Sequence, residues 1–178
     1  MKKTSILILL ILISVFACEK DDICPEATAT TPQLIVRFYD ITTPEDTKPV
    51  TNLLVYGIDD NSEPVFFKDI NIGTKDSIAI PLRTDINTTK LVLHSEYSVD
   101  DNGTPDDDSD DIVLGNPDAV DISYTRDNKY VSRACGYKAT YTNLGAALIA
   151  DSDNWITNIT IENNTIDNEN AAHINIYH

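Results

Sequence analysis

Basic residues, histidine and glycine are all scarce in this 178-residue chain. It has 13 lysines and arginines against 29 acids, three histidines and six glycines. The resulting net charge of −16 repels phosphate backbones, which argues against nucleic acid as a partner. The sequence contains no glycine-rich phosphate loop and no G-x-S-x-G nucleophile motif, and its histidines do not stand at a zinc-ligand spacing. Nucleotide-binding, serine hydrolase and zinc functions are therefore disfavoured.

Long hydrophobic runs are also lacking, with one exception near the N-terminus. Residues 6–16 are almost all apolar, but this run is shorter than the ~20 residues that span a membrane. It follows Lys2 and Lys3 and precedes the small residue Ala17, which is the order of a secretory signal peptide. Residues 1–17 are therefore predicted to be a signal peptide, and Cys18 is the first residue after the cut.

The residue at the predicted cleavage site changes the interpretation from secretion to anchoring. Residues 15–18, Val-Phe-Ala-Cys, resemble a bacterial lipobox, in which the cysteine thiol accepts lipid. Cys18 is predicted to be the lipidation site, and the membrane is then a partner through the N-terminal lipid. The alternatives are an ordinary secretory signal with a chance cysteine and a membrane-spanning helix.

An acidic tether is predicted at residues 18–32, ahead of one domain at 33–178. Residues 19–22, Glu-Lys-Asp-Asp, resemble the signal that sends Bacteroidetes lipoproteins to the outer face of the outer membrane. A merely solvated linker is the alternative. Removal of residues 1–17 would take away Lys2 and Lys3 and no acid, which leaves a net charge of −18.

Cysteine is rare, and its count is informative. With Cys18 assigned to lipid, Cys24 and Cys135 remain. Two thiols in an exported protein predict one disulfide, which would attach the tether to the domain. The alternative is a pair of free, buried thiols.

Alternating apolar and polar residues dominate the rest of the chain and predict short strands. Leu34, Val36 and Phe38 share one face of a strand, and Pro81 indicates a sheet edge or a strand end. Residues 127–128 are expected to form a tight turn, and residues 144–150 are the one weak helical candidate. Strands separated by Asn, Asp, Gly and Pro turns predict an all-β, antiparallel β-sandwich of roughly seven to nine strands, immunoglobulin-like or, as second choice, jelly-roll-like.

The Asp-rich loop at residues 100–111 is the stretch with the most evident ligand chemistry. Its carboxylates are close together, and calcium prefers six to eight oxygen ligands on a tight loop. The serines that fall at the first and twelfth positions of such a loop are poor ligands, so a solvated, self-repelling loop is the competing interpretation. The candidate metal ligands are Asp100, Asn102, Asp106, Asp108 and Asp110.

Other residues offer weaker chemistry. Trp155 could stack on a carbohydrate, but a single tryptophan on an apolar strand face favours a core position. His94 and His173 are expected to lie on strands as surface or rim residues. Acids are so plentiful that no carboxylate pair stands out for glycoside hydrolysis.

Several segments together indicate a family. Residues 132–138 read S-R-A-C-G-Y-K, residues 168–174 read N-E-N-A-A-H-I, and Cys24 is followed by Pro25. With Trp155-Ile156, these segments resemble an uncharacterised family of small Bacteroidetes lipoproteins. The resemblance implies a β-rich lipoprotein of the cell envelope with no assigned activity.

The sequence thus predicts a non-enzymatic, lipid-anchored binding or accessory module of the outer membrane. We expect it to need no cofactor and to be displayed on the cell surface. Its expected partner is an envelope protein or a glycan. A calcium-dependent binding module that uses the Asp-rich loop is the alternative, and an envelope hydrolase with an unrecognised carboxylate pair is the third hypothesis.

Overall fold

The computed structural model describes residues 23–25 and 30–178. The predicted signal peptide, the predicted lipidation site Cys18 and most of the predicted tether at 18–32 lie outside the described residues. Within the described residues the secondary structure is strand, apart from the short 3₁₀ turn η2 (Asp108–Asp110). In the same part of the chain, no helix is long and apolar enough to cross a membrane.

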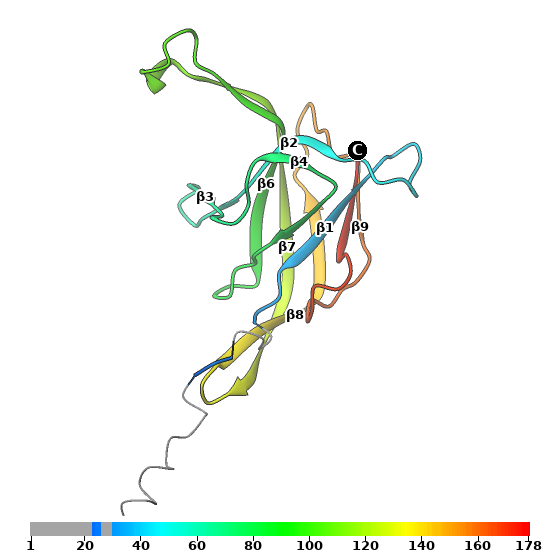
Figure 1. Cartoon of the computed structure of the whole chain (residues 1–178). Helices are drawn as coiled ribbons and strands as arrows, with labels where there is room; N and C mark the ends of the chain where they lie inside the picture. The colour runs from blue at the N-terminus through cyan, green and yellow to red at the C-terminus, as the bar shows by residue number, and fades with distance from the viewer. Residues whose placement is uncertain (1–22, 26–29) are drawn as a thin grey trace, which may run out of the picture. The chain divides into compact units, whose positions relative to one another are not determined.

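Residues 31–127 and 139–178 form one compact unit that contains a β-sandwich, as predicted (Figure 1). One sheet has the order β5-β1-β10-β9 and the other the order β3-β2-β6-β7-β8, with β4 paired to β2. The ten strands of the described part slightly exceed the predicted number. Their bounds are β1 (Leu34–Tyr39), β2 (Val50–Ile58), β3 (Pro64–Phe66), β4 (Gly73–Lys75), β5 (Ser77–Ile80), β6 (Thr88–Asp100), β7 (Ile112–Ser132), β8 (Gly136–Leu148), β9 (Asn158–Ile161) and β10 (Ile174–Tyr177).

The core lies between the inner faces of the two sheets. In β1, Leu34, Val36 and Phe38 are buried while Arg37 is exposed, as the alternation of the sequence predicts. The strand next to it, β5, is the edge of its sheet and ends just before Pro81, which lacks the N–H that a continuing ladder needs. The same inward alternation repeats in the facing sheet, where the core residues include Leu53, Val55, Leu91, Leu93, Val120 and Ile122.

One strand pair departs from the predicted antiparallel arrangement. The last strand, β10, lies beside β1 in parallel, with Val36 opposite Ile174 and Phe38 opposite Ile176. Two strands joined by a tight hairpin must be antiparallel, but β1 and β10 stand at opposite ends of the sequence. No hairpin fixes the direction of β10, so sequence alternation could not reveal it.

The turn predicted at residues 127–128 is wrong, because β7 continues through both residues to Ser132. The chain reverses at residues 133–135 instead, and Gly136 follows with φ of +67°. Glycine adopts this left-handed conformation at little cost, so the turn forms there. Residues 128–138 belong to a second compact unit, together with the described residues 23–25 and 30.

The helix considered for residues 144–150 is also wrong, because most of that segment is the end of β8. Leu144 is buried in the core and its N–H donates to the Asn164 carbonyl at 3.1 Å. Further along, the Ile149 N–H donates to the Ala119 carbonyl on β7 at 2.8 Å. Tertiary pairing therefore overrides the weak helical preference of the three alanines in this segment.

Candidate functional site

The distal parts of β6 and β7 leave the sandwich as a two-stranded ribbon, residues 98–114 (Figure 1). Pairing of β6 with β2 stops at His94, whereas its ladder with β7 continues to Asp100 opposite Ile112. Residues directly opposite each other in an antiparallel ladder share a face, so the ribbon exposes apolar side chains on both faces. Val99, Ile112, Val113 and Leu114 are each between 45% and 58% exposed.

The tip of this ribbon carries the Asp-rich loop, and its acids are engaged in local turns. The Asp100 carboxylate accepts the Asn102 N–H at 3.0 Å, and Asp110 accepts the Thr104 hydroxyl at 2.7 Å. Asp107 caps η2 by accepting the Ser109 N–H. Among the described residues, no group of three or more His, Cys, Asp or Glu side chains is arranged to hold a metal ion.

The five predicted metal ligands therefore share one loop without sharing one centre. Asn102 and Asp110 approach each other, with the Asn102 amide donating to Asp110 at 3.3 Å. Asp106 and Asp108 are exposed, and no hydrogen bond within the tip links them to that pair. Calcium binding by the loop stays a prediction.

Cys24 and Cys135 form a disulfide, with their sulfur atoms 2.07 Å apart and their Cα atoms 4.8 Å apart. This is the pairing that the cysteine count predicts. Cys135 lies in the turn between β7 and β8, where its N–H donates to the Ser132 hydroxyl at 3.0 Å. Tyr130 and Tyr137 flank the same turn, with ring centroids 5.4 Å apart.

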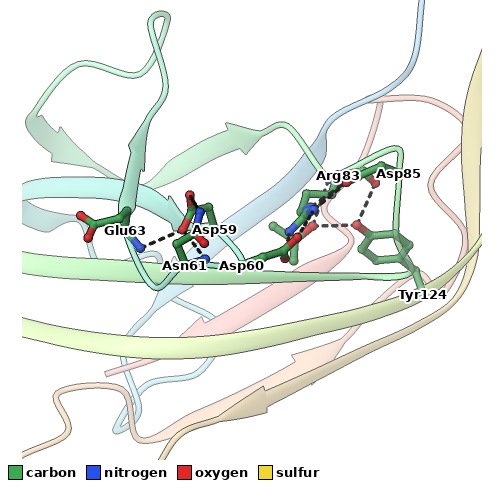
Figure 2. A network of polar contacts seen from close by, with 8 residues as sticks. Asp59, Asp60, Asn61, Glu63, Arg83, Asp85 and Tyr124 are labelled. Carbon is green, nitrogen blue, oxygen red and sulfur yellow. Dashed lines mark hydrogen bonds and ion pairs between the residues drawn. The ribbon is translucent and has the colours of Figure 1, made fainter.

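An ion-pair network lies beside β2 and the segment between β5 and β6 (Figure 2). The Arg83 guanidinium binds Asp60 at 2.6 Å and Asp85 at 2.5 Å, while its carbonyl accepts the Tyr124 hydroxyl at 2.9 Å. Arg83 lowers the pKa of Asp85 to about 2. In the adjoining turn, Asp59 accepts the N–H groups of Asn61 and Glu63, both at 2.8 Å.

An apolar hollow of about 250 Å³ adjoins this network. The residues that line it include Val65, Phe67, Pro81, Leu82 and Arg83. Because two carboxylates already neutralise Arg83, its guanidinium is not free for an anionic ligand. The arrangement joins the segment between β5 and β6 to β2 and has no evident reactive group.

A more polar pocket of about 390 Å³ lies at the base of the ribbon, lined in part by Trp155, His178, Lys48, Ser95, Glu96 and Asn116. Trp155 is half-buried against the core and donates its indole N–H to the Leu93 carbonyl at 3.2 Å. Trp155 therefore packs against the core, as predicted, and also lines the pocket. Pocket walls of this mixed character are typical of small-ligand sites. We refer to it as the Trp155 pocket.

His94 and His173 are buried, so their predicted surface or rim positions are wrong. His94 lies opposite Leu54 on the neighbouring strand and its ring stands edge-on to Tyr97 at 5.1 Å. His173 accepts the Ile35 N–H through Nδ1 at 2.9 Å. Burial lowers the pKa of both imidazoles.

Asp118 is a buried acid that the sequence reasoning missed. Its Oδ2 accepts the Ile156 N–H at 2.8 Å, which positions the segment that carries Trp155. Burial raises the pKa of this carboxyl group. The signal was present in the sequence, because Asp118 continues the inward alternation of Val120 and Ile122 towards the N-terminus.

Comparisons with known proteins identify a family without an activity. No curated protein and no solved structure matches the chain. The match is to the model of the Family of unknown function (DUF6452) and extends over residues 52–178, from β2 to the end of β10. That range contains the ribbon, the β7–β8 turn and most of the Trp155 pocket, and the chain belongs to the Family of unknown function (DUF6452).

Proposed function

We propose that this protein is a non-enzymatic, lipid-anchored binding module of the bacterial outer membrane that engages a partner protein through the β6–β7 ribbon. The signal-peptide pattern followed by Cys18 supports the anchor, and the Glu-Lys-Asp-Asp segment at residues 19–22 supports display on a Bacteroidetes cell surface. The disulfide between Cys24 and Cys135 supports an oxidising compartment.

The exposed apolar residues of the ribbon are the observation that carries the proposal. A two-stranded ribbon is only marginally stable by itself. Apolar side chains that stay exposed to water on both of its faces contribute no burial free energy to folding. Val99 and Val113 are paired on one face, and Ile112 and Leu114 lie on the other. Large exposed apolar side chains gathered on one projecting element favour an interaction surface there.

The charge at the tip indicates the chemistry of the partner. Residues 100–111 contain seven aspartates and no lysine or arginine. Burying each half-exposed apolar residue contributes roughly 1 kcal/mol, so apolar contact alone gives modest affinity. An oppositely charged surface would accelerate association and fix its orientation. The partner surface is therefore an apolar strip bordered by lysine and arginine residues.

A site-specific photo-crosslinking residue tests this surface in the full-length, lipid-anchored protein in cells. We expect a photo-crosslinking residue in place of Val113 to yield one dominant adduct with a protein. A crosslinker at Glu45, which is exposed on the β1–β2 connection, is the control and should not yield that adduct. The adduct from position 113 should weaken as salt is raised, because salt screens exposed charges.

A second variant separates ribbon binding from accidental proximity. The double substitution Ile112→Ser and Leu114→Ser removes the opposite apolar face while leaving Val113 available for the crosslinker. Loss of the adduct with an unchanged melting temperature supports the proposal. The same adduct at positions 45 and 113, or its persistence in the double variant, would contradict it.

A further inference from the structure

We infer that the Trp155 pocket binds a neutral sugar ring. The inference concerns a different surface from the ribbon and does not depend on a protein partner. It begins with the way in which β6 and β7 form the pocket wall. Between Ser95 and Ser98 the register of these strands shifts, and Glu96 occupies the irregularity.

Glu96 is held in a backbone conformation that its residue type disfavours. Its φ is +53°, in the left-handed region that glycine and asparagine adopt most readily. Three of the other four non-glycine residues with positive φ in the described part are asparagines, so a glutamate here is unusual. Strain of this kind is concentrated at functional sites, where it positions a side chain.

The opposite strand is adapted to the same irregularity. Gly115 has φ of +107°, and a Cβ atom at this position would come within 2.5 Å of the Ser95 carbonyl oxygen. The same atom would come within 2.9 Å of the Glu96 carbonyl carbon. Only glycine fits so close an approach of two backbones. Both strands therefore form the bulge, and Glu96 within it is one of the residues that line the pocket.

The chemistry of the pocket wall favours a polyhydroxylated ring. Trp155 and His178 provide an aromatic wall, with their rings nearly perpendicular and their centroids 5.4 Å apart. Glu96 is exposed, and none of the hydrogen bonds or ion pairs found in the described residues engages its carboxylate. Aromatic surface beside an available acceptor suits the apolar and hydroxyl faces of a sugar.

The remaining polar groups of the pocket wall supply both hydrogen-bond donors and acceptors. The Lys48 ammonium donates to the His178 carbonyl at 3.0 Å and lies 3.9 Å from Asp40. Asn116 donates through its amide to the Asp153 carbonyl, which leaves its Oδ1 as an acceptor. Lys48 and Glu96 are of opposite sign, so the wall favours a neutral ligand that both donates and accepts hydrogen bonds.

The fluorescence of Trp155, the only tryptophan of the chain, tests the inference directly. The probes are glucose, galactose, mannose and N-acetylglucosamine, each as the free monosaccharide and as a disaccharide, titrated into the full-length chain in detergent. We expect a saturable change with at least one of them. A stronger response to a disaccharide indicates a glycan chain as the natural source, and an equal response indicates a free sugar.

Two substitutions at one position separate recognition from folding. Glu96→Gln keeps the size of the side chain and its backbone strain, and we expect it to weaken binding at least tenfold. Glu96→Gly removes the strain together with the carboxylate, so it should abolish binding without lowering the melting temperature. Glu45→Gln removes an exposed acid outside the pocket and should bind as the unmodified chain does.

Three results would overturn the inference. The first is the lack of a saturable fluorescence change with every sugar at its highest soluble concentration. The second is binding that survives both substitutions of Glu96. The third is a melting temperature of the Glu96→Gly variant below that of the unmodified chain, because it would show that no strain is stored at this position.

Discussion

Gly115 on β7 lies against the Ser95 carbonyl of β6 so closely that a methyl group at Gly115 would stand 2.5 Å from that oxygen. We expect Gly115→Ala to lower the free energy of unfolding by about 2 kcal/mol or more, from left-handed backbone strain combined with overpacking. Urea denaturation measures the change.

Gly103 is the matched control for this substitution. Its φ is +79°, but no other atom lies within 4 Å of where its Cβ would be. Gly103→Ala should therefore cost about 1 kcal/mol, from backbone conformation alone. Equal losses at the two glycines would contradict a role for close backbone approach at the bulge.

From the environment of His173 we expect the folded protein to lose stability at mildly acidic pH. Its Nδ1 accepts the Ile35 N–H, so protonation of Nδ1 would place two donors face to face. Burial lowers the pKa of His173, and the folded state therefore binds the proton less tightly than the unfolded chain does. Its contribution to stability is present above about pH 6.5, the ordinary value for histidine, and is lost as the pH falls below it.

His173→Asn tests this linkage, because its side-chain oxygen keeps an acceptor near the position of Nδ1 and does not titrate. The measurement is the free energy of unfolding at pH 7.5 and at pH 5.5, in the unmodified chain and in the variant. We expect a smaller difference between the two pH values in the variant. Identical differences would show that His173 does not contribute.

We expect the disulfide to stabilise the folded protein. Cys24 and Cys135 are 111 residues apart in sequence, and closing so long a loop in the unfolded chain is worth about 4–5 kcal/mol in the loop-entropy model. Cys135→Ser should lower the melting temperature accordingly. Peptide mass spectrometry of unreduced protein should find Cys24 linked to Cys135, and two free thiols in folded, oxidised protein would contradict the bond.

The ribbon should be dispensable for folding. Replacing residues 99–113 by an Asn-Gly turn removes side chains that are largely exposed and keeps the pairing of β6 with β2, so we expect the free energy of unfolding to change by less than about 1 kcal/mol. Thermal melting followed by circular dichroism measures the change. A loss of several kcal/mol would show that the ribbon supports the sandwich.

Calcium addition tests the alternative function of the Asp-rich loop. The acids at the tip make local turn bonds, and Asp100 and Asp110 already accept donors from their neighbours. A ligand that binds only the folded state raises stability in proportion to the logarithm of its concentration above Kd. We expect equal melting temperatures in millimolar calcium and in chelator. A rise with calcium would restore the calcium-dependent alternative.

The sequence predicted the features that depend on local alternation or on counting. The inward positions of Leu34, Val36 and Phe38 follow from the two-residue period of a strand, and the Cys24–Cys135 bond follows from the number of cysteines. The failures depend on long-range pairing. Residues 144–150 have a weak helical preference that their contacts with Asn164 and Ala119 override.

The candidate sites were less predictable than the fold. The Asp-rich loop was identified, but the exposed ribbon beneath it depends on where the pairing of β2 with β6 stops. The Trp155 pocket brings together residues from five separate parts of the chain. Glu96 lies at the register shift between β6 and β7. Such a shift depends on how two strands pair, so the alternation pattern of one strand cannot predict it.

The bond between Cys24 and Cys135 also closes a covalent ring that contains β1 to β7, with β8 to β10 attached outside it. A protease that cuts one peptide bond within this ring, for example in the exposed aspartate tip, leaves every residue from 24 to 178 joined to whatever precedes Cys24. Release of the whole domain by a single cut requires cleavage before Cys24, because a cut after Cys135 separates only the C-terminal fragment. The exposed aspartate tip can therefore be cut by a protease without the domain separating from the segment that precedes Cys24.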